Sequence, residues 1–295
     1  MEMANLHLTL RFAGKDDAGA VAQFLRSTGY GHVHVDWRLP GEWLGTEGFV
    51  LAETTRDHVL GAGELQACLA VGADPPPAAW VRVAAVREEQ QSVSLLSAML
   101  QEVRPYLAEQ GVSQLGWLPR MGWPAEWLQA LAFEQVDEVV TFVRVDLENL
   151  PDVPSSAAAR LRPVQPNEFA RLAAIEEAAF DPLWRHSAEG LRLGWRQATS
   201  FDVALLDERI VGFQYSAPGD VQDAGHLVRL TVDPEAQRAG IGSALLLSAL
   251  HNYRRQGLRE ASLNTQLSNE PSRRLYEKFG FEMAGHRWPV WRLSI

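Results

Sequence analysis

The chain has 295 residues, of which 46% are apolar, and ten are tryptophan; this composition is typical of a folded protein with one large or two ordinary domains. Its formal charge of −10 argues against broad nucleic-acid binding and is compatible with a cationic amine substrate. No apolar run reaches the roughly eighteen residues that span a bilayer, and the start lacks a basic region followed by an apolar one, so we expect a cytoplasmic protein that does not bind membranes.

The first half contains few residues with obvious chemistry. His32 and His34 alternate in a strand-like stretch without a third ligand at usable spacing, so we interpret them as packing or surface residues and predict no metal site. Cys68 is the single cysteine, which excludes an internal disulfide and a cysteine metal cluster. Its apolar neighbours predict a buried structural role.

The two halves of the chain resemble each other, which indicates an internal repeat of domain size. Ser97 matches Ser243 and Gln110 matches Gln256, in both cases 146 residues apart. The alternative is that the halves share only the periodicity of their helices and strands.

A stretch rich in Pro, Ser and Ala at 151–159 predicts an exposed linker between a domain at 1–150 and a domain at 160–295. The second domain has a mixed α/β pattern, with Asn167 as the cap of its first helix. In chain order the pattern predicts a strand at 159–164, helices at 167–180 and 187–198, strands at 201–206, 210–216 and 226–232, a helix at 243–255, a strand at 261–267, a helix from 271, and strands near 282–286 and 290–293.

A glycine-containing turn, Gln237-Arg238-Ala239-Gly240-Ile241-Gly242, joins the strand at 226–232 to the helix at 243–255. Backbone N–H groups converge at such a helix N-terminus and form a site for a phosphate or pyrophosphate. A Walker loop is excluded because no Gly-Lys-Ser/Thr is present, and the three-glycine dinucleotide fingerprint does not fit the spacing. The remaining interpretation is the Gln/Arg-x-x-Gly-x-Gly/Ala turn that binds the pyrophosphate of coenzyme A.

A second segment completes this pattern. Ser272, Leu275 and Tyr276 stand three, six and seven residues after Asn269, and Gly280 ends the predicted helix. On these two segments the chain resembles the GNAT superfamily of acyl-CoA N-acyltransferases. The resemblance implies an α/β (α+β) fold of two tandem domains, each a mixed, mostly antiparallel sheet flanked by helices.

The resemblance also implies acetyl-CoA as the cofactor and a set of residues that contact it. These are Leu230, Thr231 and Val232 on the strand, Gln237, Arg238, Ala239, Gly240, Ile241, Gly242 and Ser243 at the turn and helix start, and Asn269, Ser272 and Tyr276 in the second segment.

In this superfamily the amine attacks the thioester directly, so the amine must lose a proton, the oxyanion must be stabilised and the thiolate must be protonated. The resemblance assigns the Leu230 N–H to the acyl oxygen and the Tyr276 hydroxyl to the thiolate. His226 falls where some members carry a catalytic glutamate, and an imidazole can accept a proton near neutral pH. A histidine that meets solvent at the strand end is the alternative, with Glu176 or Glu177 as the base.

The resemblance places the acceptor pocket at the end of the first helix of the second domain and in the residues that follow this helix. Glu176, Glu177, Asp181 and Trp184 combine carboxylates with an aromatic ring, which suits an ammonium group. The alternative is an ordinary solvated turn.

The first domain lacks the corresponding chemistry. At the repeat offset of 146 residues Ser94 and Leu96 replace the two glycines. At the nearby offset of 148 residues, which aligns Phe133 with Phe281, Leu128 replaces Tyr276. We therefore expect a degenerate, non-catalytic first domain.

Together these features predict an N-acetyltransferase that transfers an acetyl group to a primary amine of a small molecule or peptide, acting as a monomer or homodimer. Two alternatives stay open. One is a mycothiol-synthase-like acyltransferase with an aminosugar-containing thiol precursor as acceptor, and the other is an acyl-CoA-binding sensor without turnover.

Overall fold

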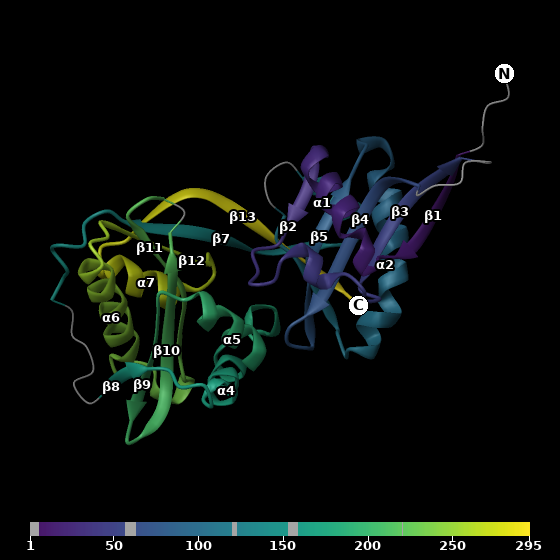
Figure 1. Ribbon diagram of the computed structural model, residues 1–295. Coiled ribbons are helices and arrows are strands. Elements are labelled where there is room, and N and C mark those ends of the chain that lie inside the picture. Colours follow the sequence, from purple (N-terminus) through teal and green to yellow (C-terminus); the bar gives the residue numbers. More distant parts are fainter. Residues whose placement is uncertain (1–5, 57–62, 120–122, 153–158, 220) are drawn as a thin grey trace. The chain divides into compact units, whose positions relative to one another are not determined.

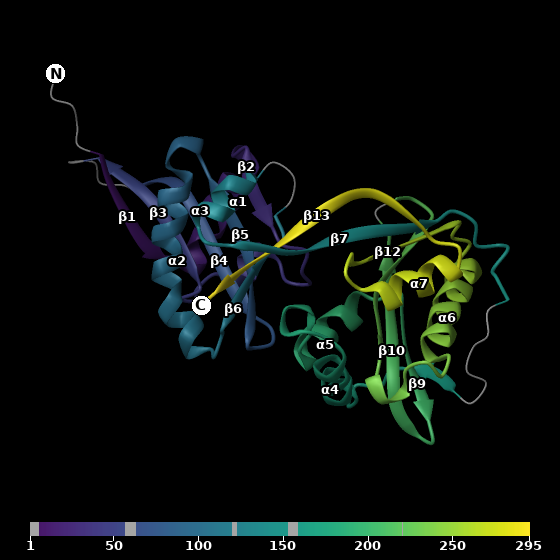
Figure 2. The ribbon, with the colours of Figure 1, turned by 180° about the vertical axis from the view of Figure 1, so that it is seen from behind.

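The computed structural model describes residues 6–56, 63–119, 123–152, 159–219 and 221–295. The chain forms two compact units (Figures 1 and 2). Unit 1 contains the residues up to 136 together with 289–295, and unit 2 contains residues 137–288. Each unit has a mixed, mostly antiparallel sheet flanked by helices, so the expected fold class is confirmed.

Unit 1 is built on the sheet order β1-β3-β4-β5-β6, in which only the β5–β6 pairing is parallel. Its elements are β1 (Leu6–Phe12), α1 (Ala18–Ser27), β2 (Tyr30–Val33), β3 (Phe49–Arg56), β4 (Glu64–Ala73), β5 (Ala78–Val86), α2 (Ser92–Glu109), β6 (Gln114–Trp117) and α3 (Ala125–Ala130).

Strand β5 is covered on both edges. One edge pairs with β4 along its length. The other edge pairs with β6 at residues 78–80 and with β2 at residues 83–86. Strand β2 therefore fills the edge of β5 at the point where β6 leaves it.

Unit 2 has the sheet order β7-β12-β11-β10-β9-β8, in which only the β11–β12 pairing is parallel. Helices α4 and α5 cover one face, and α6 and α7 cover the other (Figures 1 and 2). Its elements are β7 (Glu134–Arg144), β8 (Arg160–Pro163), α4 (Phe169–Ala179), α5 (Ala188–Gln197), β9 (Ser200–Leu206), β10 (Arg209–Pro218), β11 (Ala224–Val232), α6 (Ile241–Arg255), β12 (Glu260–Gln266), α7 (Glu270–Lys278) and β13 (Glu282–Ser294).

The register of the central strands supports the internal repeat. In unit 1 Ala78 pairs with Gln114, and in unit 2 Ala224 pairs with Glu260. Both residues of the second pair lie 146 residues after those of the first, which is the offset found in the sequence.

Two strands depart from the division of the sequence into halves. Strand β13 is continuous where two strands were expected, and its last part belongs to unit 1, where Trp291 pairs with Trp117 of β6. Strand β7 lies wholly in the first half of the sequence, but its residues 137–144 belong to unit 2, where Val143 pairs with Ser262 of β12. Of the expected linker at 151–159, residues 153–158 lie outside the described part of the chain.

Several local expectations can be compared with the structure. Cys68 is fully buried, as expected. His32 is buried, with Nε2 3.1 Å from the Val81 carbonyl oxygen. Helix α4 begins one residue later than expected, because Glu168 rather than Asn167 occupies the N-cap position. Within the described ranges no three His, Cys, Asp or Glu side chains are grouped to hold a metal ion, and no helix has the length and apolarity to cross a bilayer.

Candidate active site

The site begins where two parallel strands of unit 2 separate. The β11–β12 register runs from Ala224 opposite Glu260 to Leu227 opposite Leu263 and then stops. At this point the β10–β11 register shifts, and Val228 is the extra residue of a β-bulge. Bulges bend and twist a strand, so β11 turns away from β12 and leaves residues 228–232 without a partner on that side.

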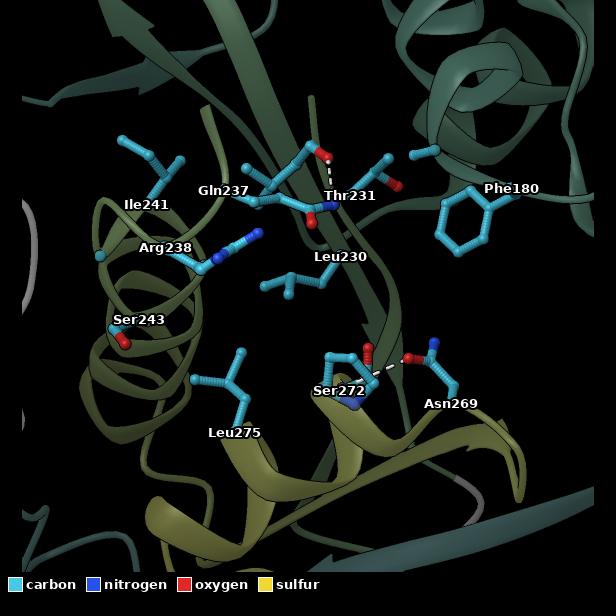
Figure 3. A pocket seen from close by; sticks show the side chains of 15 residues that line it. Phe180, Leu230, Thr231, Gln237, Arg238, Ile241, Ser243, Asn269, Ser272 and Leu275 are labelled. Carbon is cyan, nitrogen blue, oxygen red and sulfur yellow. Dashed lines mark hydrogen bonds between the residues drawn. The ribbon is translucent and has the colours of Figure 1, made fainter. Parts of the chain in front are cut away.

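A cavity of about 510 Å³ lies beside this stretch, between β11, the start of α6 and the start of α7 (Figure 3). Leu230 and Leu275 point into it, and Phe180 bounds it from the end of α4. The cavity brings together eleven of the predicted cofactor residues, namely Leu230, Thr231, Val232, Gln237, Arg238, Gly240, Ile241, Gly242, Ser243, Asn269 and Ser272. Ala239 is exposed in the same turn and does not line it.

A second, smaller cavity of about 40 Å³ lies between the separated strands. Tyr276 lines it, together with Arg229 of β11. The two cavities share Phe180, Leu230, Asn269 and Ser272, so they form one continuous site.

The N-terminus of α6 borders the larger cavity. Gly240 precedes the helix with φ +78°, a left-handed conformation that glycine tolerates. The first helical bond is donated by Ala244 N to Gly240 O at 3.0 Å, so the N–H groups of residues 241–243 have no acceptor within the helix. A Cβ on Gly242 would lie 3.3 Å from Leu275 Cδ2, so a larger residue here would require the Leu275 side chain to shift by a few tenths of an ångström.

Ion pairs and capping hold the turn before α6 in place. Asp233 accepts hydrogen bonds from Arg171 Nη2 (2.6 Å) and from Glu235 N (3.2 Å). The Gln237 side chain donates to the Val232 carbonyl (3.3 Å). At the start of α7, Asn269 accepts from Ser272 N (3.3 Å), and Pro271 stands in the first turn as predicted.

The charges of the site all have one sign. Among the described residues that line the two cavities, the side chains charged at neutral pH are Arg238 and Arg229, and no carboxylate is present. The helix dipole adds partial positive charge at the start of α6. In a protein with a formal charge of −10, this local excess of positive charge favours an anionic ligand.

Tyr276 lies at the inner end of the site. Its side chain is buried, and burial raises the pKa of Tyr276 to about 12, while a hydrogen bond with Ser272 and the charge of Arg229 oppose the rise. The hydroxyl therefore carries its proton at neutral pH.

Glu176 is part of a buried ion pair and lines neither cavity. It accepts hydrogen bonds from Arg229 Nε (3.0 Å), Arg229 Nη2, Thr231 Oγ1 (2.6 Å) and His186 N (3.2 Å). Burial raises the pKa of Glu176, but the positive charge of Arg229 and the hydrogen bonds with His186 and Arg229 outweigh burial and lower this pKa to about 2. A carboxylate so stabilised and so fully occupied by donors is a poor proton acceptor.

His226 lies on the same strand but outside both cavities. Its neighbour Leu227 packs with Leu246 and Tyr276 on the α6/α7 side, so the His226 side chain points toward the α4/α5 side. Its Nδ1 is 2.8 Å from Ser262 Oγ. Leu230 lies four residues, or about 13 Å of extended strand, further along β11.

The other expected acceptor residues surround the end of α4 without lining the cavities. Glu177 and Asp181 are exposed. Trp184 is partly buried, and its carbonyl accepts a hydrogen bond from Arg229 Nη2.

Ten lining residues were not singled out as site residues from the sequence: Ala179, Phe180, Leu227, Val228, Arg229, Asn264, Thr265, Gln266, Pro271 and Leu275. Arg229 stacks on Phe180 with its Cζ 4.0 Å from the ring centroid. Leu275 was recognised as part of the motif but not as a lining residue. The position of Leu275, one residue before Tyr276 and on the face of α7 that meets α6, is the signal that could have indicated its lining role.

Comparison with known proteins gives a family match over the part of the chain that contains the site. Residues 169–281 match the model of the Acetyltransferase (GNAT) family. The mycothiol acetyltransferase of Actinosynnema mirum is 30% identical over 158 residues, which are 50% of this chain and 51% of that protein. The mycothiol acetyltransferase of Acidimicrobium ferrooxidans is 35% identical over 107 residues, covering 35% of this chain and 34% of that protein. The chain thus matches about half the length of these relatives or less.

Solved structures share the fold over nearly the whole chain. A GCN5-related N-acetyltransferase from Sphaerobacter thermophilus has a TM-score of 0.59 at 18% identity, with 97% of this chain and 95% of that chain covered. A tandem GNAT protein from the clavulanic acid biosynthesis pathway has a TM-score of 0.55 at 15% identity, with 98% of both chains covered.

Residues 169–281 of unit 2 thus match the GNAT acetyltransferase family, and the chain as a whole has the fold of a tandem GNAT protein.

Proposed function

We propose that unit 2 is an acetyl-CoA-dependent N-acetyltransferase that acts on a primary amine. The observation that carries this proposal is the continuous site in which the unpaired start of α6, two arginines and a protonated Tyr276 meet beside an open strand edge. The cavity residues suit a long anionic ligand. The N–H groups of residues 241–243 and the Arg238 side chain would hold its diphosphate.

The open edge of β11 suits the amide-containing arm of coenzyme A. Residues 228–232 have no strand partner on the β12 side, so their main-chain groups can bind the arm as an added strand. In this arrangement the Leu230 N–H stabilises the oxyanion, and Tyr276 carries the proton for the leaving sulfur.

The proton of the amine has no carboxylate acceptor among the described cavity residues. His226 faces the α4/α5 side, where Glu177, Asp181 and Trp184 also lie, so it can serve as base through a water. Glu176 instead acts as the partner of Arg229.

A second candidate concerns the acceptor. Because the matched relatives are mycothiol acetyltransferases, an aminosugar-containing thiol precursor belongs in the acceptor panel beside polyamines, aminoglycosides, amino acids and peptides.

The test is release of free coenzyme A from acetyl-CoA by the purified full chain against this panel. We expect release with at least one amine, and formation of the acetylated product by mass spectrometry. Tight acetyl-CoA binding with no release for any acceptor class would instead support the sensor.

A further inference from the structure

We propose that Arg229 stabilises the negative charge that develops on the sulfur of coenzyme A as it leaves, and that Glu176 is the positioning residue that holds the Arg229 guanidinium in place. This inference rests on the proposed function of unit 2. It adds a charged group to a reaction for which the sequence motifs supply only a tyrosine and a backbone N–H.

The position of Arg229 carries the first part of the argument. Arg229 lines the small cavity between the separated strands, and Tyr276 lines the same cavity from α7. Among the described residues around this cavity, Arg229 is the only one with a charged side chain at neutral pH. A negative charge that forms in this cavity is therefore attracted to the positive charge of Arg229.

The guanidinium is fixed before any ligand binds. Nε donates to Glu176 (3.0 Å), and Nη2 donates to both Glu176 and the Trp184 carbonyl. One face of the guanidinium stacks on Phe180. These hydrogen bonds use Nε and Nη2. The two N–H groups of Nη1 take no part in them and are therefore suited to face a ligand.

The ion pair of Glu176 and Arg229 forms a dipole whose two ends have different exposure. Glu176 lies behind Arg229 in α4 with 0% of its side chain exposed, whereas the Arg229 side chain is 11% exposed and borders the cavity. The negative end of this dipole is therefore buried and the positive end meets the site. The other titratable groups nearby are His186 beside Glu176, Tyr215 opposite Arg229 on β10, and Tyr276.

The chemistry explains why such a charge is needed. The amine nitrogen forms a bond to the thioester carbon, the C–S bond breaks, and its electron pair leaves on sulfur, while the nitrogen loses a proton to a base or to water. A thiol has an ordinary pKa of about 8.5, well below the pKa of about 12 that burial gives Tyr276. Full proton transfer from Tyr276 to the thiolate is thus uphill, and a fixed cation lowers the energy of the thiolate itself.

The test uses coenzyme A itself, so it needs no knowledge of the acceptor. The full-length protein is saturated with coenzyme A, and the pKa of the bound thiol is measured from the ultraviolet absorbance of the thiolate, with the ligand-free protein as blank. The protein adds little thiolate signal of its own, because burial raises the pKa of Cys68, the single cysteine, to about 12.

We expect the bound thiol in the wild-type protein to titrate below its free value. Arg229→Gln should raise this pKa by about one pH unit, the size expected for a partly compensated charge near the sulfur. Arg229→Lys should recover most of the shift. The matched control is Arg162→Gln, which removes the ion pair of Arg162 with Glu168 at the start of α4, and it should leave the thiol pKa unchanged.

An equal thiol pKa in wild-type protein and Arg229→Gln would overturn the inference about Arg229. Failure of the wild-type protein to bind coenzyme A would overturn the proposed function instead. If Arg229→Gln alone does not fold because Glu176 is left buried without a partner, the variant Arg229→Gln/Glu176→Gln removes both charges and takes its place in the comparison.

Discussion

At the scale of single residues, Tyr276 and Glu176 have opposite environments. Tyr276 lies in the cavity and keeps its proton, whereas Glu176 lies behind the cavity wall and keeps its charge. Only the first is suited to exchange protons during a reaction.

Replacing Tyr276 by phenylalanine removes the hydroxyl but keeps the ring that packs near Phe142 and Phe281. We expect kcat to fall about tenfold to a hundredfold, at or below the lower end of the roughly hundredfold to ten-thousandfold range for general acid help, because Arg229 still supports the thiolate. The Kd for acetyl-CoA should change little. A steady-state assay with a responsive acceptor and calorimetric titration measure the two effects, and an unchanged kcat would remove Tyr276 from the mechanism.

Glu176 should make stability depend on pH in the acid range. The pKa of Glu176 is about 2 in the folded protein and about 4.3 in an unfolded chain. Its contribution to the free energy of unfolding is therefore complete above the pKa of the unfolded chain, and it is lost as pH falls toward the pKa of the folded protein. Compared with Glu176→Gln, the wild-type advantage in unfolding free energy should shrink by about 1.4 kcal/mol per pH unit between about pH 4 and pH 2.

Urea unfolding at several pH values measures this difference. The control is Glu177→Gln, at the exposed neighbouring position on α4, which should follow the wild-type curve. A wild-type advantage over Glu176→Gln that stays constant with pH would contradict the ion-pair assignment.

At the scale of elements, the start of α6 is the part of the site most sensitive to a side chain. Gly242→Glu places a negative group beside Leu275 and in the cavity that would receive the diphosphate. We expect acetyl-CoA affinity to fall at least about a hundredfold, corresponding to about 2.7 kcal/mol, without loss of the fold.

A closely matched control exists in α1. Gly19 is also the second residue of its helix, and a Cβ there would meet nothing within 4 Å. Gly19→Glu should bind acetyl-CoA like the wild type in calorimetry. Normal affinity in Gly242→Glu would show that the cavity at α6 is not the diphosphate site.

The elements also show what sequence reasoning can reach. The turn at 237–242 and the helix with Tyr276 were recognised because each is a contiguous motif with local rules for glycine and proline. The pairing of Arg229 with Glu176 joins residues 53 positions apart, and nothing in the spacing of either residue indicates it. Phe180 was missed for the same reason, because its role depends on the packing of α4 beside β11.

The end of the chain illustrates a second limit. The residues near 282–286 and 290–293 were correctly read as extended, yet they form one strand, β13, whose last part joins unit 1. Periodicity predicts that a segment is a strand but does not say which sheet it enters. The site roles assigned from the motif stay predictions until the variants are measured.

At the scale of the whole molecule, the last residues of the chain complete the first unit. Trp291 and Leu293 are buried in the core cluster of unit 1, and Trp291 pairs with Trp117 of β6. Deleting residues 289–295 should therefore destabilise unit 1 by several kcal/mol, since removing one buried large side chain costs about 3–5 kcal/mol.

Hydrogen exchange can locate this effect. Amides of β6 in unit 1 should lose protection in the truncated protein, while amides of β10 in unit 2 serve as the internal control. Loss of protection confined to unit 2 would contradict the assignment of the final strand to unit 1.

The number of ligands per chain is a further property of the whole molecule. We expect one acetyl-CoA per chain, and we expect that the double variant Ser94→Gly/Leu96→Gly does not gain a second site, although it restores glycines at the start of α2. Calorimetric titration measures both stoichiometries. Two bound molecules in the double variant would show that side chains at α2 were the only obstacle.

The obstacle that remains in that variant is strand β2. At the repeat offset, residues 83–86 of β5 correspond to residues 229–232 of β11, the open edge of unit 2. In unit 1 this edge already carries four main-chain pairings to β2. Unit 1 thus contains an intramolecular competitor for this edge. Strand β2 belongs to the same chain as the edge, so one copy is always present for each edge, and adding free ligand does not dilute it. A cofactor could enter only by peeling away a strand of the domain that was to bind it.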